Sequence, residues 1–178
     1  MLAYLFVVFA IAARFLVLLF PQMWLNFTPV GAALLFFGAR GPRKHAWAAV
    51  LLLAGSDVLL TKFVYGYPYT PDHIATIAWY AAIVAMGTLL RNHAGPARIV
   101  GAALATSVSF FAISNFAVWL VWNMYPHNLG GLMACYAAAV PFFRNDVVSN
   151  LLFTTVMFSV PALIEMLRPT TAKAQPGI

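Results

Sequence analysis

The chain has 178 residues, of which 63% are hydrophobic and only 8% are charged, and its net charge is +6. A soluble domain carries about 25% charged residues, so the composition excludes an ordinary soluble protein and predicts a helical membrane protein with several spans. The apolar runs are continuous, which excludes a β-barrel, whose strands alternate apolar and polar residues. We expect an all-α, polytopic fold with residues 1–168 as one transmembrane domain and 169–178 as a short cytoplasmic tail.

Crossing the hydrocarbon core of a bilayer takes about 20 apolar residues. Runs of sufficient length occur, in chain order, at residues 1–20, 44–64, 73–91, 97–122 and 146–167. A further span at residues 28–40 is short and must borrow length from the loop before it. Residues 132–143 are too few to cross, and we expect a short surface or re-entrant helix that ends at Pro141. The sequence thus predicts six transmembrane helices with a short extra helix before the last span.

The basic residues occupy alternate loops. Seven of the ten lysines and arginines lie in the second loop, the fourth loop and the tail: Arg40, Arg43, Lys44, Arg91, Arg98, Arg168 and Lys173. Such residues face the cytoplasm, so both termini are predicted to be cytoplasmic, in the inner (plasma) membrane of a bacterial cell. The other loops are rich in aromatic residues and share the outer face. Because the positive charge is explained by the orientation of the chain in the membrane, we expect contact with the lipid bilayer and no nucleic-acid partner.

The break between the first two apolar runs, residues 24–31, reads Trp-Leu-Asn-Phe-Thr-Pro-Val-Gly. Thr28 followed by Pro29 predicts a helix start, because threonine can cap the first free N–H groups and proline fits the first helical position. Gly31 allows a helix or a ligand to approach that start closely. Helix starts also suit anionic or carbonyl-bearing ligands. The alternatives are a rigid, well-capped turn and one wall of a binding site.

Two ionisable residues lie at matching depth in the first and third spans, namely Arg14 and Asp57. Intramembrane charges are costly and are usually paired or functional. We expect an ion pair between them, either as the charged pole of a ligand site or as a structural pair that sets the helix register.

Polar residues also lie in the last two spans. Asn115, Trp119 and Trp122 share one face of the fifth span at helical spacing, which predicts either a stacking wall for a planar heterocycle or an interfacial aromatic belt. Asn145 or Asp146 could cap the last span. Asn150 and Thr154 continue the Asp146 face, as ligand contacts or as polar contacts between helices.

No pattern of catalytic residues occurs in the chain, so we expect no enzyme activity and no cofactor. Its four histidines lie in or beside loops without metal-ligand spacing, and its single cysteine, Cys135, adds neither a disulfide nor a cysteine-based metal site. Small residues at positions 78 and 82, 81 and 85, and 101 and 105 predict close helix packing or a docking face for a partner.

Six spans, basic cytoplasmic loops and aromatic outer loops accompany a specific run of residues. The run comprises 12–15, Ala-Ala-Arg-Phe; 26–38, Asn-Phe-Thr-Pro-Val-Gly-Ala-Ala-Leu-Leu-Phe-Phe-Gly; and Ser56-Asp57. It resembles an uncharacterised bacterial membrane family related to the substrate-binding S components of energy-coupling factor (ECF) transporters. The resemblance implies a vitamin-type ligand in the outer half of the membrane, and transport when an ATPase-driven coupling module binds on the cytoplasmic side. The Ala-xxx-Ala pattern that S components carry on the first helix is absent here, which leaves the 78–85 face as the alternative docking surface.

These observations predict a protein that binds a small, vitamin-like or heterocyclic solute from outside. The expected ligand-binding residues are Arg14, Asn26, Thr28, Asp57, Asn115, Trp119 and Asn150. The expected lid or gate residues are Trp24, Phe27, Tyr67, Tyr69 and Tyr125. The rival hypothesis is a structural or assembly subunit of a larger membrane complex, whose polar residues would be paired with one another.

Overall fold

A computed structural model describes residues 1–16 and 26–167, and every regular secondary-structure element in this part of the chain is a helix. Its six α-helices are α1 (Leu2–Leu16), α2 (Val30–Arg40), α3 (Ala46–Leu59), α4 (Asp72–Thr88), α5 (Pro96–Val121) and α6 (Leu129–Leu167). A 3₁₀ turn, η2 (Arg43–His45), precedes α3, and a π-helical turn, η3 (Leu60–Val64), extends it. The all-α class predicted from composition is therefore confirmed.

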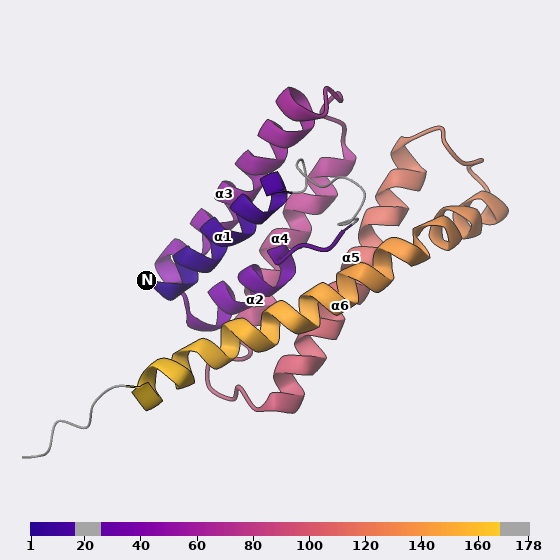
Figure 1. Ribbon diagram of the computed structural model, residues 1–178. Coiled ribbons are helices and arrows are strands. Elements are labelled where there is room, and N and C mark those ends of the chain that lie inside the picture. The colour runs from indigo at the N-terminus through magenta and orange to yellow at the C-terminus, as the bar shows by residue number, and fades with distance from the viewer. Residues whose placement is uncertain (17–25, 168–178) are drawn as a thin grey trace, which may run out of the picture.

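Successive helices run in alternating directions, so the bundle has two distinct ends (Figure 1). One end, called here the basic end, carries the N-terminus, residues 41–45, residues 89–95 and the last turns of α6. The opposite end, called the aromatic end, carries residues 65–71 and 122–128, which include several tyrosines. The predicted separation of basic and aromatic loops is present for the described loops. Arg168 and Lys173 lie outside the described residues.

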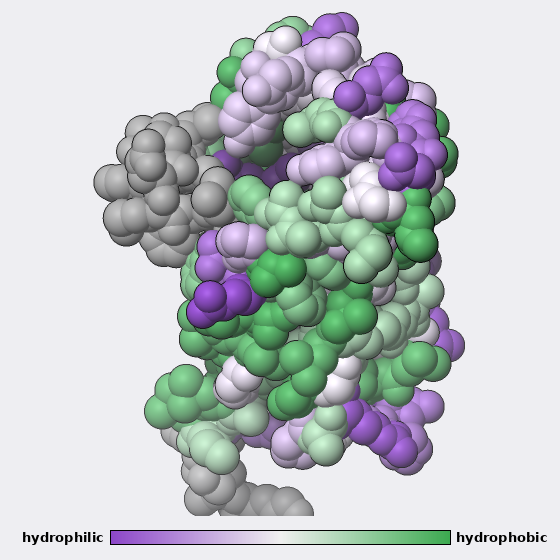
Figure 2. All heavy atoms as spheres, turned by 90° about the vertical axis from the view of Figure 1, so that its right-hand side faces the viewer, coloured by the Kyte–Doolittle hydropathy of each residue, from purple (hydrophilic) through white to green (hydrophobic). Residues whose placement is uncertain are grey.

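Within the described residues, three helical stretches are long and apolar enough to cross a membrane: Arg43–Val64, Pro96–Val121 and Leu129–Leu167. The space-filling view agrees, because hydrophobic side chains fill the middle of the face it shows and hydrophilic ones gather toward the top and bottom (Figure 2). The helix α2 has only 11 residues, a length of ~16 Å at the usual rise of an α-helix. It cannot cross a hydrocarbon core of about 30 Å without the chain that precedes it.

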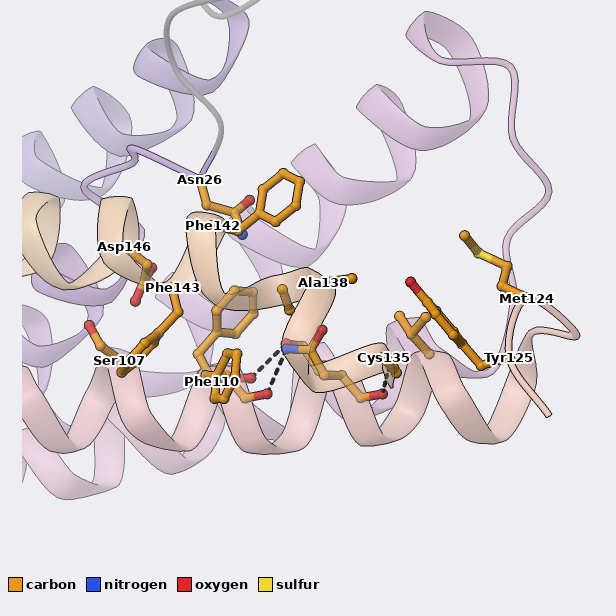
Figure 3. A pocket seen from close by; sticks show the side chains of 15 residues that line it. Asn26, Ser107, Phe110, Met124, Tyr125, Cys135, Ala138, Phe142, Phe143 and Asp146 are labelled. Atoms are coloured by element: carbon orange, nitrogen blue, oxygen red, sulfur yellow. Dashed lines mark hydrogen bonds between the residues drawn. The ribbon is translucent and has the colours of Figure 1, made fainter. Parts of the chain in front are cut away.

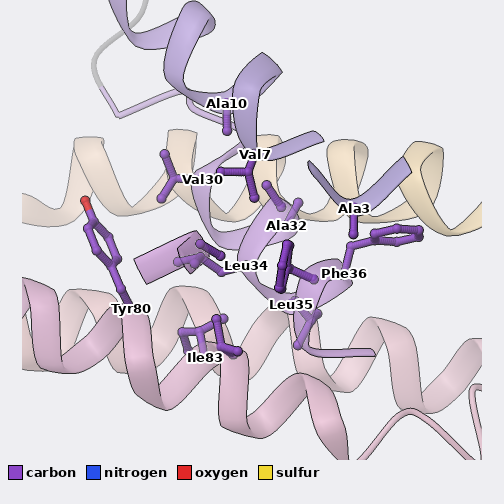
Figure 4. Close-up of a cluster of buried hydrophobic side chains, with 14 of the residues drawn as sticks. Ala3, Val7, Ala10, Val30, Ala32, Leu34, Leu35, Phe36, Tyr80 and Ile83 are labelled. Carbon is purple, nitrogen blue, oxygen red and sulfur yellow. The ribbon is translucent and has the colours of Figure 1, made fainter. Parts of the chain in front are cut away.

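The short helix α2 is the centre of the bundle. Every residue from Val30 to Ala39 is buried, and α2 contacts each of the other five helices. Side chains of α1 cover one side of α2, and Tyr80 and Ile83 of α4 cover another (Figure 4). A helix that is apolar on all sides belongs inside a bundle, so the apolar character of this segment reflects protein contacts and not only lipid contact.

Two glycines allow α2 and α4 to pack with their backbones in contact. A Cβ atom built on Gly38 would lie 2.8 Å from the Cα atom of Gly87, and a Cβ atom built on Gly87 would lie 2.9 Å from the Cα atom of Gly38. Such small-residue crossings let membrane helices approach closely. The predicted small-residue pairs on α4 do not serve this purpose, because Ala78, Ala81, Ala82 and Ala85 are all exposed.

The last helix differs from the prediction. Residues 132–143 do not form a separate helix, and Asp146 does not cap a new one; both belong to α6, which runs for 39 residues with Pro141 and Pro161 inside it. Proline removes one helical hydrogen bond, but neighbouring helices make this tolerable inside a membrane bundle. The helix bends along its length (Figure 1) and continues. Its ~59 Å length exceeds the thickness of the hydrocarbon core.

The predicted cap of α2 by Thr28 is also absent. The residue that precedes α2 is Pro29 and the one that precedes α4 is Pro71, and neither helix start has a side-chain capping hydrogen bond. Thr28 instead accepts, through its backbone carbonyl, a hydrogen bond of 3.3 Å from the Ser149 hydroxyl of α6. This contact ties the segment before α2 to the last helix.

Candidate functional site

Two neighbouring cavities lie between the helices. The large chamber has a volume of about 360 Å³ and is lined mainly by α5, α6 and the loop between them (Figure 3). The small chamber has a volume of about 120 Å³ and is lined by residues of α1, α2, α4, α5 and α6. Asn26, Phe110 and Asp146 line both chambers, so these three residues form the boundary between them.

The segment before α2 places non-helical backbone at this boundary. Asn26 has a positive φ of 57°, a conformation that asparagine adopts more readily than most residues. Asn26 and Thr28 line the small chamber, as do the first two residues of α2, Val30 and Gly31. Non-helical backbone at membrane depth is tolerated where it lines a cavity. The shortness of α2 and the presence of a cavity are therefore connected.

The predicted pair between Arg14 and Asp57 is confirmed. One guanidinium nitrogen of Arg14 forms an ion pair with Asp57, and the other donates a 2.8 Å hydrogen bond to the Ser56 hydroxyl. Arg14 lines the small chamber, whereas Asp57 does not. The second carboxylate oxygen of Asp57, Oδ2, is buried without a hydrogen-bond partner among the described residues. Asp57 thus acts on the chamber by holding Arg14.

Asp146 is the second acid of the site, a half-buried residue that lines both chambers. It forms no ion pair with any residue in the part of the chain that the structure describes, and its Oδ2 is buried without a hydrogen-bond partner. The Ser107 hydroxyl of α5 points toward this carboxylate (Figure 3). A buried carboxylate oxygen without a partner is costly, and of the described residues that line the chambers only Asp146 has such an atom.

A row of polar side chains continues along α6 from Asp146 through Asn150 to Thr154. The amide nitrogen of Asn150 donates hydrogen bonds to the Ala103 carbonyl at 3.0 Å and to the Ser107 hydroxyl at 3.1 Å. Asn150 is only 2% exposed and lines neither chamber. Its role in the structure is to join α6 to α5 behind the cavity, and a direct ligand contact remains a prediction.

The residues that were predicted to form a stacking wall on α5 lie in two different places. Asn115 lines the large chamber, and its amide donates a 2.7 Å hydrogen bond to the carbonyl of Phe111 on the same helix. Trp119 lines neither chamber; its indole nitrogen donates a 3.0 Å hydrogen bond to the Pro126 carbonyl, and its ring meets His127. In the structure Trp119 therefore anchors the loop at residues 122–128.

The predicted lid residues occupy different places. Tyr125 lines the large chamber, and Phe27 packs its ring on Phe153 with ring centroids 5.8 Å apart. Tyr67 and Tyr69 are exposed and line neither chamber. Trp24 lies outside the described residues.

Tyr69 stacks on His73, with ring centroids 4.2 Å apart. The His73 ring in turn lies 3.2 Å from the hydroxyl of Thr61, which belongs to the π-helical turn η3. Partial burial raises the pKa of the Tyr69 phenol, and the nearby Asp57 and Asp72 carboxylates raise it further. The phenol is therefore neutral at physiological pH, and these contacts connect the start of α4 to η3.

The aromatic walls of the large chamber were not predicted. They consist of Phe110 and Phe111 on α5 and Phe142 and Phe143 on α6, with the rings of Phe111 and Phe143 4.6 Å apart. A prediction that continued the last helix through Pro141 would have found part of this wall. Cys135, Phe142, Asp146 and Asn150 recur at helical spacing and share a face.

The arrangement can bind a small molecule but carries no metal-type cluster. Among residues 1–16 and 26–167, no three His, Cys, Asp or Glu side chains are grouped as metal ligands would be. The chambers instead combine aromatic walls with a few polar groups, as small-molecule pockets do.

An all-helical bundle with three long apolar helices and a hydrophobic outer face indicates the class of helical membrane proteins. The chain belongs to the family of unknown function designated DUF6580, which matches residues 1–172. No curated protein and no solved structure matches the chain.

Proposed function

We propose that this protein binds a small organic solute inside the membrane, in the large and small chambers. The observation that carries the proposal is a cavity of about 360 Å³ with aromatic walls and, at its inner boundary, the Asp146 carboxylate, one of whose oxygens has no hydrogen-bond partner among the described residues. Ligand pockets typically occupy about 300–1,000 Å³ and combine apolar walls with a few placed polar groups. The proposal assigns the protein to solute binding and uptake, without catalysis.

The proposed orientation follows from the two ends of the bundle. All six helices, with the segment before α2, cross a bacterial plasma membrane, and the basic end faces the cytoplasm because of Arg40, Arg43, Lys44 and Arg91. The solute then enters from the aromatic end, where Tyr125 borders the large chamber. A hollow is visible near the upper end of the face in Figure 2.

The resemblance to ECF S components extends this proposal to transport of a vitamin-like solute. In such a transporter the solute-binding protein requires an ATPase-driven coupling module. The exposed alanines at positions 78, 81, 82 and 85 on α4 offer a flat surface for a partner helix.

A second candidate function is that of a structural or assembly subunit. The same exposed alanines support it, as does the complete pairing of Arg14 with Asp57 and Ser56. This hypothesis requires no solute, and it leaves the large chamber and the unpartnered Asp146 carboxylate without a role.

Mass spectrometry of solute retained by the purified protein tests the proposal. Ala138→Phe places a ring in the large chamber, whereas Ala137→Phe adds the same ring at a neighbouring exposed position that lines no chamber. We expect a solute in the wild type and in Ala137→Phe, and its loss from Ala138→Phe. Absence of solute from folded wild-type protein, or its retention by Ala138→Phe, would favour the structural hypothesis.

A further inference from the structure

We propose that the solute is an organic cation, a protonated amine or a cationic heterocycle, whose charged nitrogen pairs with Asp146. This inference rests on the proposed function and names the chemical class that the same chambers select. It begins with the Asp146 carboxylate, which lines both chambers and has a buried oxygen without a partner among the described residues. A buried carboxylate requires a compensating charge, and a cationic ligand supplies it from the cavity.

The charge balance of the site supports a cation. Among the described residues, the acidic and basic side chains at the chambers are Arg14, with its partner Asp57, and Asp146. Arg14 and Asp57 neutralise each other, so the Asp146 carboxyl is the acidic group there that no described residue balances. The chain as a whole carries a net charge of +6, which makes a locally acidic cavity a specific feature and not a reflection of composition.

The walls of the large chamber also suit a cation. Phe110, Phe111, Phe142 and Phe143 line it, and Tyr125 borders it toward the aromatic end. The face of an aromatic ring attracts positive charge, and the attraction is stronger where water is excluded. A planar or aromatic ligand body would stack on the same rings. Aromatic walls and one carboxylate together select a charged nitrogen attached to an apolar group.

The small chamber offers groups of a different kind, which favour hydrogen-bond acceptors. Arg14, Thr28 and the first two residues of α2 line it, and the free N–H groups of a helix start favour acceptors. An acceptor group of the ligand could lie there, beyond the boundary formed by Asn26 and Asp146. An anionic ligand would be repelled by the Asp146 carboxylate at the same boundary. It would also gain little from Arg14, which already has an acidic partner. The charged nitrogen therefore lies at the boundary.

Three matched probes test the charge: phenethylamine, phenethyl alcohol and phenylacetate, which share a ring and differ in the charge of the end group. Their affinities for the purified protein are measured by calorimetry and by the rise in melting temperature. Asp146→Asn removes the carboxylate charge with little change in shape. Glu165→Gln is the control, because it makes the same charge change at an exposed position near the other end of α6.

We expect phenethylamine to bind more tightly than the neutral and anionic probes. We expect its affinity to fall at least ~10-fold in Asp146→Asn, as for a lost buried charge pair, and to be unchanged in Glu165→Gln. The inference is overturned if no probe binds, if either other probe binds as tightly as the amine, or if Asp146→Asn binds the amine as the wild type does.

The solute released from wild-type protein gives a second measurement that requires no variant to fold. We expect it to contain a basic or permanently charged nitrogen. A neutral or anionic solute that Ala138→Phe releases would overturn the cation inference and leave the proposed function intact. If the cation inference and the proposed function are both wrong, the wild-type protein will carry no solute, and no probe will stabilise it.

Discussion

The contact between α2 and α4 provides the sharpest test of the fold, because two glycines bring the helix backbones together. A Cβ atom added at Gly38 would lie 2.8 Å from the Gly87 Cα atom, and one added at Gly87 would lie 2.9 Å from the Gly38 Cα atom. The nearest atoms are backbone oxygens: the Val84 carbonyl oxygen lies 2.1 Å from the Cβ at Gly38, and the Leu35 carbonyl oxygen lies 2.3 Å from the Cβ at Gly87. Close C–H···O contacts lie at about 3.3–3.6 Å, so each alanine must move the helices apart by roughly 1 Å. The obstructing atoms are backbone atoms, which no side-chain rotation can move.

The expected cost follows from the position of α2 at the centre of the core. Overpacking a core costs about 1–3 kcal/mol and occasionally more. Because the neighbouring backbone is rigid, we expect Gly38→Ala and Gly87→Ala each to lower the free energy of unfolding by ~3 kcal/mol. On the scale of soluble domains of 150–250 residues, this lowers the melting temperature by roughly 10 °C. Because both substitutions disturb one contact, the double variant should lose less than the sum of the two losses. Thermal unfolding in detergent, followed by tryptophan fluorescence, measures all three.

Gly55→Ala and Gly101→Ala are the matched controls. Both glycines are exposed within helices, and an added Cβ atom at either meets nothing within 4 Å. Alanine favours a helix over glycine by about 1 kcal/mol, so these variants should melt at or slightly above the wild-type temperature. If Gly38→Ala or Gly87→Ala melts as high as these controls, the close crossing of α2 and α4 is refuted.

Four further substitutions test three individual contacts. Arg14→Gln and Asp57→Asn should each destabilise the protein by ~3 kcal/mol, because each leaves a buried charge unmatched, and the double variant should melt higher than either single variant. Asn150→Ala should lower the free energy of unfolding by about 1 kcal/mol, because it removes the hydrogen bonds from α6 to α5. Trp119→Phe removes the bond to the Pro126 carbonyl and should speed amide hydrogen exchange in residues 122–128.

Each of these has a control or a contrary outcome. A double Arg14→Gln, Asp57→Asn variant that is no more stable than the worse single variant would show that the pair is not the energetic unit. Thr155→Ala, at an exposed neighbour on α6, should leave stability nearly unchanged. Trp47→Phe removes a similar indole bond at the basic end, so faster exchange in residues 122–128 of that variant would contradict a local role for Trp119.

Much of the helix pattern follows from local sequence. The runs predicted at 44–64 and 97–122 agree closely with Arg43–Val64 and Pro96–Val121, because a long apolar run is a strong local signal. The Arg14–Asp57 pair was also predictable, because depth along each span limits the possible partners of a buried charge. The role of that pair in ligand binding remains a prediction.

The same reasoning failed where neighbouring helices override a local preference. Pro141 ends a helix in most settings, but packing inside a bundle carries α6 through it. Position along a span also could not distinguish Asn115, which lines the large chamber, from Trp119, which holds a loop. Both lie on one face of α5, and only the path of the loop at 122–128 separates them.

The amino-acid sequence by itself determines that this protein is all-helical, apolar enough for a membrane, and polarised between a basic and an aromatic end. These are properties of composition and local order along the chain. Only the tertiary structure decides that α2 is enclosed by the other helices, and that Asp146 lies between two chambers with one carboxylate oxygen unpartnered among the described residues. The physical reason is that the surroundings of a buried side chain depend on helices distant in the sequence, and apolar periodicity does not encode their relative placement.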